Sequence, residues 1–177
     1  MNELQLGFIF HKEKCIQCHG CETACKMWRK SEYCVSLRRV FNIWSGTYPD
    51  ITCVSLSISC MHCFQPACAD ACPVGAISKR EADGVVLVDK TLCTGCRACL
   101  DACPYDVPQF GADNQMLKCD MCIANCETPD NDFRAPPCVR TCPTGALGLT
   151  AETPGEKVQT ENETAALYQR IKSTGNG

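Results

Sequence analysis

The sequence predicts an α+β fold of two similar units, one inserted within the other, with loop-rich structure around cysteine-lined sites. Three observations carry this prediction. The cysteines gather in four groups, three of which end in Cys-Pro. A compact segment with the turn and alternation signals of a β-hairpin joins the second group to the third. The stretches CPVGAI (72–77) and CPTGAL (142–147) repeat one another at the ends of the second and fourth groups.

The four groups hold most of the 19 cysteines of this 177-residue chain. Group I is Cys15, Cys18, Cys21 and Cys25; group II is Cys60, Cys63, Cys68 and Cys72; group III is Cys93, Cys96, Cys99 and Cys103; group IV is Cys119, Cys122, Cys138 and Cys142. Three close thiols, a fourth thiol and then proline form the run C-x2-C-x2-C-x3-C-P of bacterial ferredoxins, in which the fourth cysteine ligates the other cluster of a pair. Each unit is therefore expected to be bacterial-ferredoxin-like, with two [4Fe–4S] clusters.

Two other uses of cysteine fit this spacing less well. Structural zinc sites typically join two separated pairs of ligands, whereas groups I and III place a third thiol directly after the first pair. Disulfides are typical of small secreted domains, but the cysteine count is odd and the N-terminus shows no secretory signal. Zinc and disulfides are therefore minor alternatives to iron.

The expected organisation follows the order of the chain. Residues 1–59 contain the first half of one ferredoxin-like unit, here called the split unit, followed by a strand-rich insert. Residues 60–110 form the complete second unit, here called the inner unit. Residues 111–150 supply the second half of the split unit. Residues 151–177 form a tail with a short helix at about 162–172.

Groups II and III belong to one unit because the segment between them is short and predicts a hairpin, with its turn at 82–84 and a strand at 85–88. Groups I and IV then remain, and we expect them to form the split unit together. The exchange of fourth cysteines between paired clusters gives four ligand sets. Set A is Cys15, Cys18, Cys21 and Cys142; set B is Cys60, Cys63, Cys68 and Cys103; set C is Cys93, Cys96, Cys99 and Cys72; set D is Cys119, Cys122, Cys138 and Cys25. Every position holds a cysteine, so we expect four [4Fe–4S] clusters, with iron as the metal and no catalytic residue.

Three cysteines remain outside the sets. Cys34 and Cys53 lie in strand-like stretches and are expected to be buried free thiols that pack as small hydrophobic side chains. Cys126 lies in a polar loop of group IV and is an alternative ligand to Cys122, which the C-x2-C spacing favours.

Two histidines and three aromatic residues are prominent near the groups. His19 and His62 lie inside cysteine runs. Because every ligand position already has a thiol, we expect both at the surface or beside a cluster rather than on iron. Trp28, Trp44 and Tyr48 gather between groups I and II, where core packing or a subunit contact explains them.

Charge and motifs exclude several classes of function. The formal charge is −3, and four thiolates against a 2+ core add about −2 for each cluster, so the loaded protein would carry about −11. Such a charge argues against nucleic acid as a partner, because phosphate binding needs a basic face. No segment reaches the roughly 18 apolar residues that span a bilayer, and no phosphate loop, dinucleotide fingerprint or nucleophile motif stands out. We therefore expect an electron carrier that is soluble or held at a membrane by partners.

The chain resembles the four-cluster iron–sulfur subunits of molybdopterin oxidoreductases, above all the dimethyl sulfoxide reductase type. The resemblance rests on CIQCHGCETACK, LSISCMHCFQPACADACPVGAI, GVVLVDKTLCTGCRACLDACPYDVPQF, KCDMC and PPCVRTCPTGAL, which cover most of residues 8–149. Cys96 matches the cysteine of the dimethyl sulfoxide type, where nitrate reductase relatives have tryptophan. The resemblance implies the same pairing of clusters and electron transfer within an oxidoreductase complex of anaerobic respiration.

The same resemblance implies partners. A large catalytic subunit with a bis(pyranopterin) molybdenum or tungsten cofactor would face the cluster of set A. A membrane quinol-oxidising anchor subunit or a soluble carrier would face the cluster of set D. The alternative is a subunit linked to formate dehydrogenase or hydrogenase, or a free polyferredoxin. Without an export signal of its own, the protein is expected in the cytoplasm, or on the periplasmic side or cell surface after co-export with a signal-bearing catalytic subunit.

Overall fold

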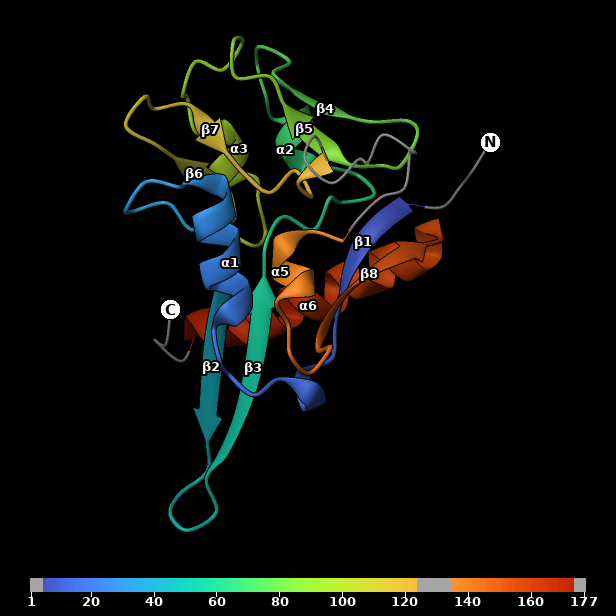
Figure 1. Ribbon diagram of the computed structural model, residues 1–177. Coiled ribbons are helices and arrows are strands. Elements are labelled where there is room, and N and C mark those ends of the chain that lie inside the picture. Colours follow the sequence, from blue (N-terminus) through green and yellow to red (C-terminus); the bar gives the residue numbers. More distant parts are fainter. Residues whose placement is uncertain (1–4, 124–134, 174–177) are drawn as a thin grey trace.

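The computed structural model describes residues 5–123 and 135–173, where four two-stranded antiparallel sheets alternate with mostly short helices (Figure 1). The strands are β1 (Gln5–Phe10), β2 (Arg39–Ser45), β3 (Thr52–Ile58), β4 (Ile77–Lys79), β5 (Val86–Val88), β6 (Gln109–Phe110), β7 (Met116–Leu117) and β8 (Leu147–Glu152). The helices are η1 (Lys12–Lys14), α1 (Gly20–Arg29), α2 (Ala67–Asp70), α3 (Ala98–Asp101), α5 (Pro137–Arg140) and α6 (Pro154–Ser173). Small helices and short hairpins around cysteine-rich loops agree with the predicted α+β class.

Strands β1 and β8 bring distant parts of the chain together. They pair antiparallel from Gln5 opposite Glu152 to Phe10 opposite Leu147. Beside them, helix α1 packs against helix α5 (Figure 1). Because α1 carries the end of group I and α5 carries part of group IV, this pairing places the first and last cysteine groups side by side.

Strands β4 and β5 form the hairpin that the sequence predicts between groups II and III. Ile77 pairs with Val88 and Lys79 with Val86. Gly84 closes the turn with φ +71°, a backbone conformation that glycine adopts without strain. Helix α2 packs against helix α3. The arrangement repeats that of β1, β8, α1 and α5: in both, a strand following Cys-Pro pairs with a strand that precedes another cysteine group.

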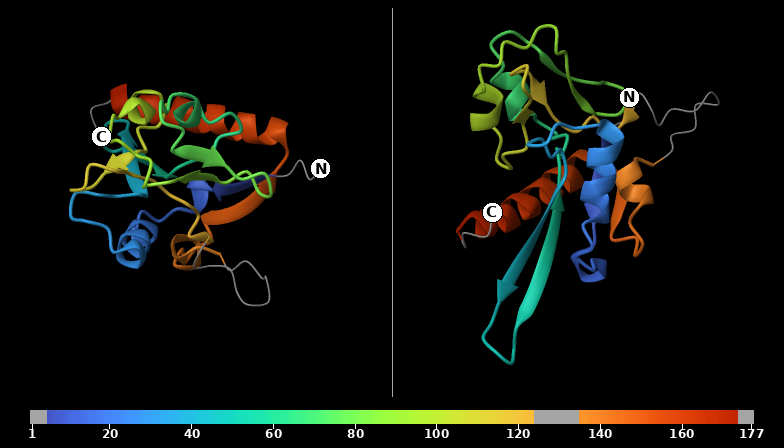
Figure 2. Two further views of the ribbon diagram at one scale, coloured as in Figure 1. Left: turned by 90° about the horizontal axis from the view of Figure 1, so that it is seen from above. Right: turned by 60° about the vertical axis from the view of Figure 1, so that its left-hand side comes forward.

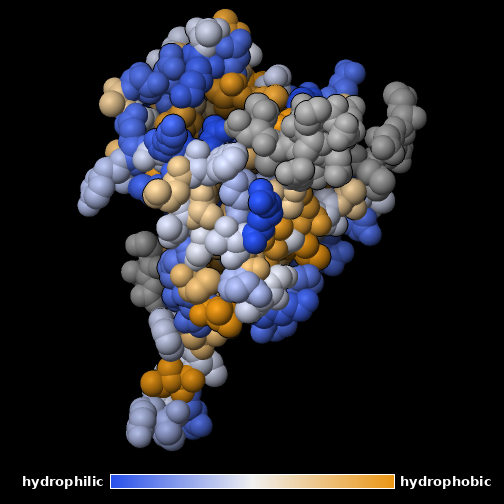
Figure 3. Space-filling model, in the orientation of Figure 1, coloured by the Kyte–Doolittle hydropathy of each residue, from blue (hydrophilic) through white to orange (hydrophobic). Residues whose placement is uncertain are grey.

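Strands β2 and β3 form a longer hairpin that projects away from the rest of the molecule (Figures 1 and 2). Trp44 and Tyr48 near its end are 58% and 88% exposed, and Trp28 on α1 is 48% exposed. Core packing within this chain therefore does not explain these aromatic residues, and the other predicted explanation, a subunit contact, stays a prediction. Ile51 and Val54 are exposed as well, and hydrophobic residues are visible toward the end of the hairpin in the space-filling view (Figure 3).

Helix α6 is longer than the sequence predicts. It begins at Pro154, not near residue 162, and ends at Ser173. The Thr153 backbone N–H and hydroxyl both donate to the Glu156 carboxylate, at 2.9 and 2.8 Å. Proline at the first helical position adds a fixed φ suited to a helix start. The stretch TPGE (153–156) thus contains signals for the start of a helix. The prediction of a short helix at about 162–172 did not take these signals into account.

The described core is divided into three small apolar clusters. One lies under α6 and consists of Ile43, Leu56, Ile58, Met61, Tyr105, Val107, Tyr168 and Ile171. The second consists of Phe8, Val85, Met121, Ile123, Cys138 and Leu147, and the third of Ile77, Val86, Cys99 and Met116. Cysteines of the four groups pack against or belong to all three. The core is therefore organised around the cysteines.

The three cysteines outside the predicted sets differ in how their observed environment compares with the prediction. Cys34 is exposed and lies in a turn, so the expectation of a buried strand residue is wrong. The residues that follow it, Val35 and Leu37, are buried. Cys53 lies in β3 and is half-buried. Cys126 lies outside the described residues.

Candidate iron–sulfur sites

Each cysteine run bends sharply through left-handed backbone. Non-glycine residues with positive φ within the runs are Gln17, His19, His62, Arg97, Met121 and Cys122. L-residues rarely adopt this conformation, because the side chain approaches the following carbonyl. The runs thus fold as tight loops rather than as helices. In groups II and III the loop leads to a four-residue helix, α2 or α3, and a Cys-Pro follows shortly after the helix ends. In group IV, Cys142-Pro143 likewise follows the four-residue helix α5.

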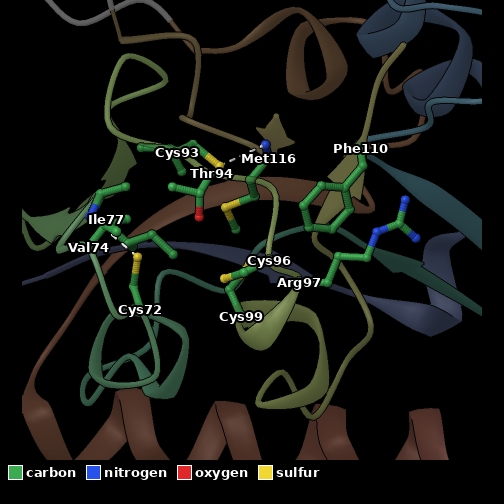
Figure 4. A pocket seen from close by; sticks show the side chains of 12 residues that line it. Cys72, Val74, Ile77, Cys93, Thr94, Cys96, Arg97, Cys99, Phe110 and Met116 are labelled. Atoms are coloured by element: carbon green, nitrogen blue, oxygen red, sulfur yellow. Dashed lines mark hydrogen bonds between the residues drawn. The ribbon is translucent and has the colours of Figure 1, made fainter. Parts of the chain in front are cut away.

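The four cysteines of set C line one cavity. Cys93, Cys96 and Cys99 come from the group III loop, and Cys72 comes from the end of group II (Figure 4). Ile77, Val88, Phe110 and Met116 complete the apolar part of the wall. The backbone N–H of Ala76 donates to the Cys72 sulfur and that of Met116 to the Cys93 sulfur, both at 3.3 Å. The walls are apolar, and backbone amides point at sulfur.

The four cysteines of set A line a second cavity. Cys15, Cys18 and Cys21 approach it from the group I loop, and Cys142 enters from the far end of the chain. His19 lines the same cavity, and its Nδ1 lies 2.9 Å from the Glu22 carboxylate. Two segments more than a hundred residues apart therefore share one site, which the β1–β8 pairing makes possible.

Set B gathers beside the apolar cluster under α6. Burial raises the pKa of the Cys63 thiol well above its usual range. The Glu161 carboxylate and the charges of Cys60, Cys103 and Cys68 raise this pKa further. Three other members of set B are therefore electrostatic neighbours of Cys63.

Two members of set D, Cys25 and Cys138, lie on the helices α1 and α5, which pack against each other. Burial raises the pKa of the Cys25 thiol to about 11, and negative charge at Cys138 contributes to the rise. Burial likewise raises the pKa of Cys119, whose neighbours include Cys25. Cys122, the fourth member, is buried.

The donor chemistry fits iron–sulfur clusters. Burial raises the pKa of Cys25 and Cys68 to about 11, so either thiol alone would hold its proton at neutral pH. A thiolate in such surroundings needs bound metal to compensate its charge. No three His, Cys, Asp or Glu side chains in 5–123 and 135–173 lie close enough to share one ion. A cubane does not require this, because each of its four thiolates binds a different iron.

His62 is fully buried, so of the two expected positions, at the surface or beside a cluster, the surface is excluded. The Val86 backbone N–H donates to its Nδ1 at 3.0 Å. Its Nε2 has no hydrogen-bond partner within the part of the chain that the structure describes. Burial, together with the positive charges of Lys118 and Lys157, holds the pKa of His62 well below its usual value. The imidazole is therefore neutral and packs beside group II.

Buried cations near the cysteines are the features that sequence reasoning missed. Arg38, Lys118 and Lys157 are 2%, 6% and 0% exposed. Lys118 donates to the carbonyl oxygens of Val86 and Cys119. No local pattern distinguishes these three residues from the chain's exposed lysines and arginines, so the sequence offered no signal for them.

Two family models match the chain. The model for a 4Fe-4S dicluster domain covers residues 51–152, more than half of the chain, and the model for a 4Fe-4S binding domain covers residues 12–28. Together they include all four cysteine groups. Among the described residues, no helix combines the length and the hydrophobicity that crossing a membrane requires.

Curated relatives match over most of their length. The B subunit of anaerobic dimethyl sulfoxide reductase from Haemophilus influenzae is 38% identical, and the match covers 96% of this chain and 84% of the relative. The protein of the same name from Escherichia coli K12 is 40% identical, with 81% and 72% covered. The formate dehydrogenase iron-sulfur subunit of Wolinella succinogenes is 36% identical, with 82% and 81% covered.

Proposed function

Because the protein belongs to the iron–sulfur electron-transfer subunits of the dimethyl sulfoxide reductase family, we propose that it carries four [4Fe–4S] clusters and relays single electrons between a donor and a molybdopterin catalytic subunit. Its cysteine-rich, ferredoxin-type domains bind [4Fe–4S] clusters. The single observation that supports four clusters is that all sixteen proposed ligand positions hold cysteine.

The proposed architecture is one ferredoxin-like unit inserted within another. The inner unit spans 60–110, and the split unit combines 1–59 with 111–150. Two parallel sets of contacts support it: β4 with β5 and α2 with α3 in the inner unit, β1 with β8 and α1 with α5 in the split unit. In each, the fourth cysteine of one run reaches the site of the other.

The proposed ligand sets have geometric support. The complete sets A and C each line a single cavity. In set B, Cys60, Cys68 and Cys103 act on the pKa of Cys63, and in set D, Cys25 is an electrostatic neighbour of both Cys138 and Cys119. The shared cavities of sets A and C and the electrostatic neighbours within sets B and D support the proposed sets.

This chemistry assigns the protein a conducting role. A [4Fe–4S] cluster exchanges one electron, and with thiolate on all four irons it offers no open position to a substrate. The protein's own residues hold the sulfur ligands of set C in a largely apolar cavity and direct backbone N–H groups at Cys72 and Cys93. Burial and hydrogen bonds to sulfur are the levers by which a protein sets cluster potentials.

The proposed partner is a large catalytic subunit with a bis(pyranopterin) molybdenum or tungsten cofactor. The relatives that are subunits of dimethyl sulfoxide reductase support this partner. The projecting β2–β3 hairpin, with Trp44, Tyr48 and Ile51 exposed, is the surface we propose for a subunit contact. A membrane quinol-oxidising anchor is a further proposed partner. A formate dehydrogenase- or hydrogenase-linked role is the second candidate, favoured by the formate dehydrogenase subunit match and by hydrogenase-2 operon protein HybA of Escherichia coli O157:H7, 31% identical.

Anaerobic purification from the native host, with metal analysis of the co-eluting proteins, tests the proposal. We expect about sixteen irons per chain, together with molybdenum or tungsten in a large partner. The same iron content with a formate dehydrogenase, a hydrogenase or no partner would favour the second candidate. Zinc in place of iron, in protein never exposed to air, would contradict both.

A further inference from the structure

Arg38 is a buried guanidinium held in one position by named contacts. It directly precedes β2 and is only 2% exposed. One terminal nitrogen donates to the Ser57 hydroxyl at 3.1 Å and the other to the Ser59 hydroxyl at 2.9 Å. The guanidinium carbon lies 4.3 Å from the centre of the Phe8 ring. Its Nε has no hydrogen-bond partner within the described residues. The side chain is therefore fixed but incompletely satisfied.

Arg38 forms no ion pair with a carboxylate in the described parts of the chain. Glu163 lines the same cavity but accepts a hydrogen bond from Gln159. Arginine does not lose its proton in proteins, and an unpaired buried charge is strongly unfavourable. By contrast, the buried Lys157 ammonium lies 3.1 Å from the Glu152 carboxylate. Among the described residues, no carboxylate therefore compensates the charge of Arg38.

Cysteines of the split unit lie close to Arg38, and in the inner unit its charge acts on the neutral His62. The Ser57 hydroxyl that accepts from Arg38 lies 3.5 Å from the Cys21 sulfur. The Phe8 ring that packs against the guanidinium belongs to the apolar cluster against which Cys21, Cys25 and Cys119 pack. In line with this placement, burial raises the pKa of Cys25 and Cys119, and the Arg38 charge opposes the rise at both. Cys21 belongs to proposed set A, and Cys25 and Cys119 belong to proposed set D. In the inner unit, Lys118 is the cation that lowers the pKa of Cys68.

We propose that Arg38 is the buried counter-ion shared by the two clusters of the split unit, and that its fixed charge raises their reduction potentials. This inference rests on the four-cluster function proposed above. Each loaded site carries about −2, and taking up one electron makes it more negative by one. A positive charge at fixed distance in a low-dielectric interior stabilises the reduced form more than the oxidised form. Arg38 is thereby a positioning residue for electron flow through one half of the molecule.

The test is a redox titration monitored by electron paramagnetic resonance on the anaerobically purified protein with its co-eluting partner. Signals lost in Cys18→Ser and Cys138→Ser assign the two split-unit centres, and signals lost in Cys63→Ser and Cys96→Ser assign the two inner-unit centres. In Arg38→Met, we expect the reduction equilibrium constants of the split-unit centres to fall at least tenfold, about 59 mV for a one-electron couple. The inner-unit centres should keep their potentials. Arg38→Lys, which retains the charge, should recover most of the shift.

Arg39→Met is the matched control, because Arg39 is the adjacent arginine but donates to the carbonyl oxygens of Tyr105 and Asp106. It should leave the split-unit potentials unchanged. If Arg38→Met loses the split-unit clusters altogether, their recovery in Arg38→Lys also supports the counter-ion role. Unchanged potentials in Arg38→Met, an equal shift in Arg39→Met, or cluster loss in both Arg38 variants would overturn it. Iron content of the unaltered protein separately tests the four-cluster function.

Discussion

At the scale of single residues, Cys96 has two properties that make it informative. Its thiol lines the cavity shared by Cys72, Cys93 and Cys99 (Figure 4). It is also exposed. A small polar substitution at an exposed position disturbs packing little, so its effect reports on ligation.

We expect Cys96→Ser to alter one of the four clusters. A serine hydroxyl is a harder and poorer ligand for cluster iron than a thiolate. Iron content should therefore fall by about one to four atoms per chain, and one resonance signal should change while the others persist. Metal analysis and electron paramagnetic resonance of anaerobic protein provide the measurement.

Cys34→Ser is the control for this experiment, because Cys34 is exposed and belongs to no proposed set. It should retain about sixteen irons and all signals. An unaltered iron content and spectrum in Cys96→Ser would show that the assignment of set C is wrong.

At the scale of elements, helix α6 connects the β1–β8 sheet with the apolar cluster beside β2 and β3. It packs on β1 and β8, and it contributes Tyr168 and Ile171 to the apolar cluster beside β2 and β3. Near its start, the buried Lys157 ammonium lies 3.1 Å from Glu152 on β8, and the Thr160 hydroxyl donates to the same carboxylate. This ion pair fixes the helix to the sheet that closes the split unit.

Lys157→Met should destabilise the protein by about 3–5 kcal/mol, because it leaves the Glu152 carboxylate buried without its positive partner. The apparent melting temperature, compared at one scan rate under anaerobic conditions, is the suitable measure, since cluster loss makes unfolding irreversible. The double variant with Glu152→Gln should recover part of the loss, because no unpaired charge remains.

Lys172→Met is the matched control on the same helix. Lys172 pairs with Asp106 at 2.7 Å, but both side chains are substantially exposed. Exposed ion pairs contribute little to stability. If Lys157→Met lowers the melting temperature no more than Lys172→Met does, the buried pair is not what fixes α6.

At the scale of the whole molecule, three small apolar clusters are arranged around cysteines. None of these clusters is large enough to resemble the core of a conventional domain of this length. Iron–sulfur clusters bridging the thiols would connect segments that otherwise share few apolar contacts.

Removal of iron should therefore unfold most of the chain. Anaerobic treatment with a chelator and an oxidant of the clusters should abolish the far-ultraviolet circular dichroism of the sheets and helices as iron is lost. Protein kept in buffer without chelator or oxidant should retain both iron and spectrum. An iron-free chain with the spectrum and melting temperature of the loaded protein would contradict this dependence.

The sequence predicted the structure correctly where a local pattern is compatible with a single arrangement of the backbone. The interval between groups II and III predicts the β4–β5 hairpin, which the structure confirms. It was insufficient where burial depends on contacts between distant segments. Arg38 and Arg39 are adjacent and identical in type, yet only Arg38 is fully buried, because Ser57, Ser59 and Phe8 surround it. Cys34 lies in a turn rather than in the strand that the sequence predicts. The early start of α6 was missed because the helix-start signals at Thr153 and Pro154 were given too little weight.

The pairing of β1 with β8 bears on how the protein is made. Synthesis proceeds from the N-terminus, so β1 leaves the ribosome about 140 residues before its partner strand. All ligands of the proposed sets B and C lie within residues 60–103. Proposed set A, in contrast, is complete only after Cys142 has been synthesised, when almost the whole chain exists. The inner unit can therefore acquire its metal first. Until Cys142 is available, the group I thiols have no complete cluster site, and oxygen can oxidise them. An anaerobic environment therefore protects this chain most during the interval before its release from the ribosome.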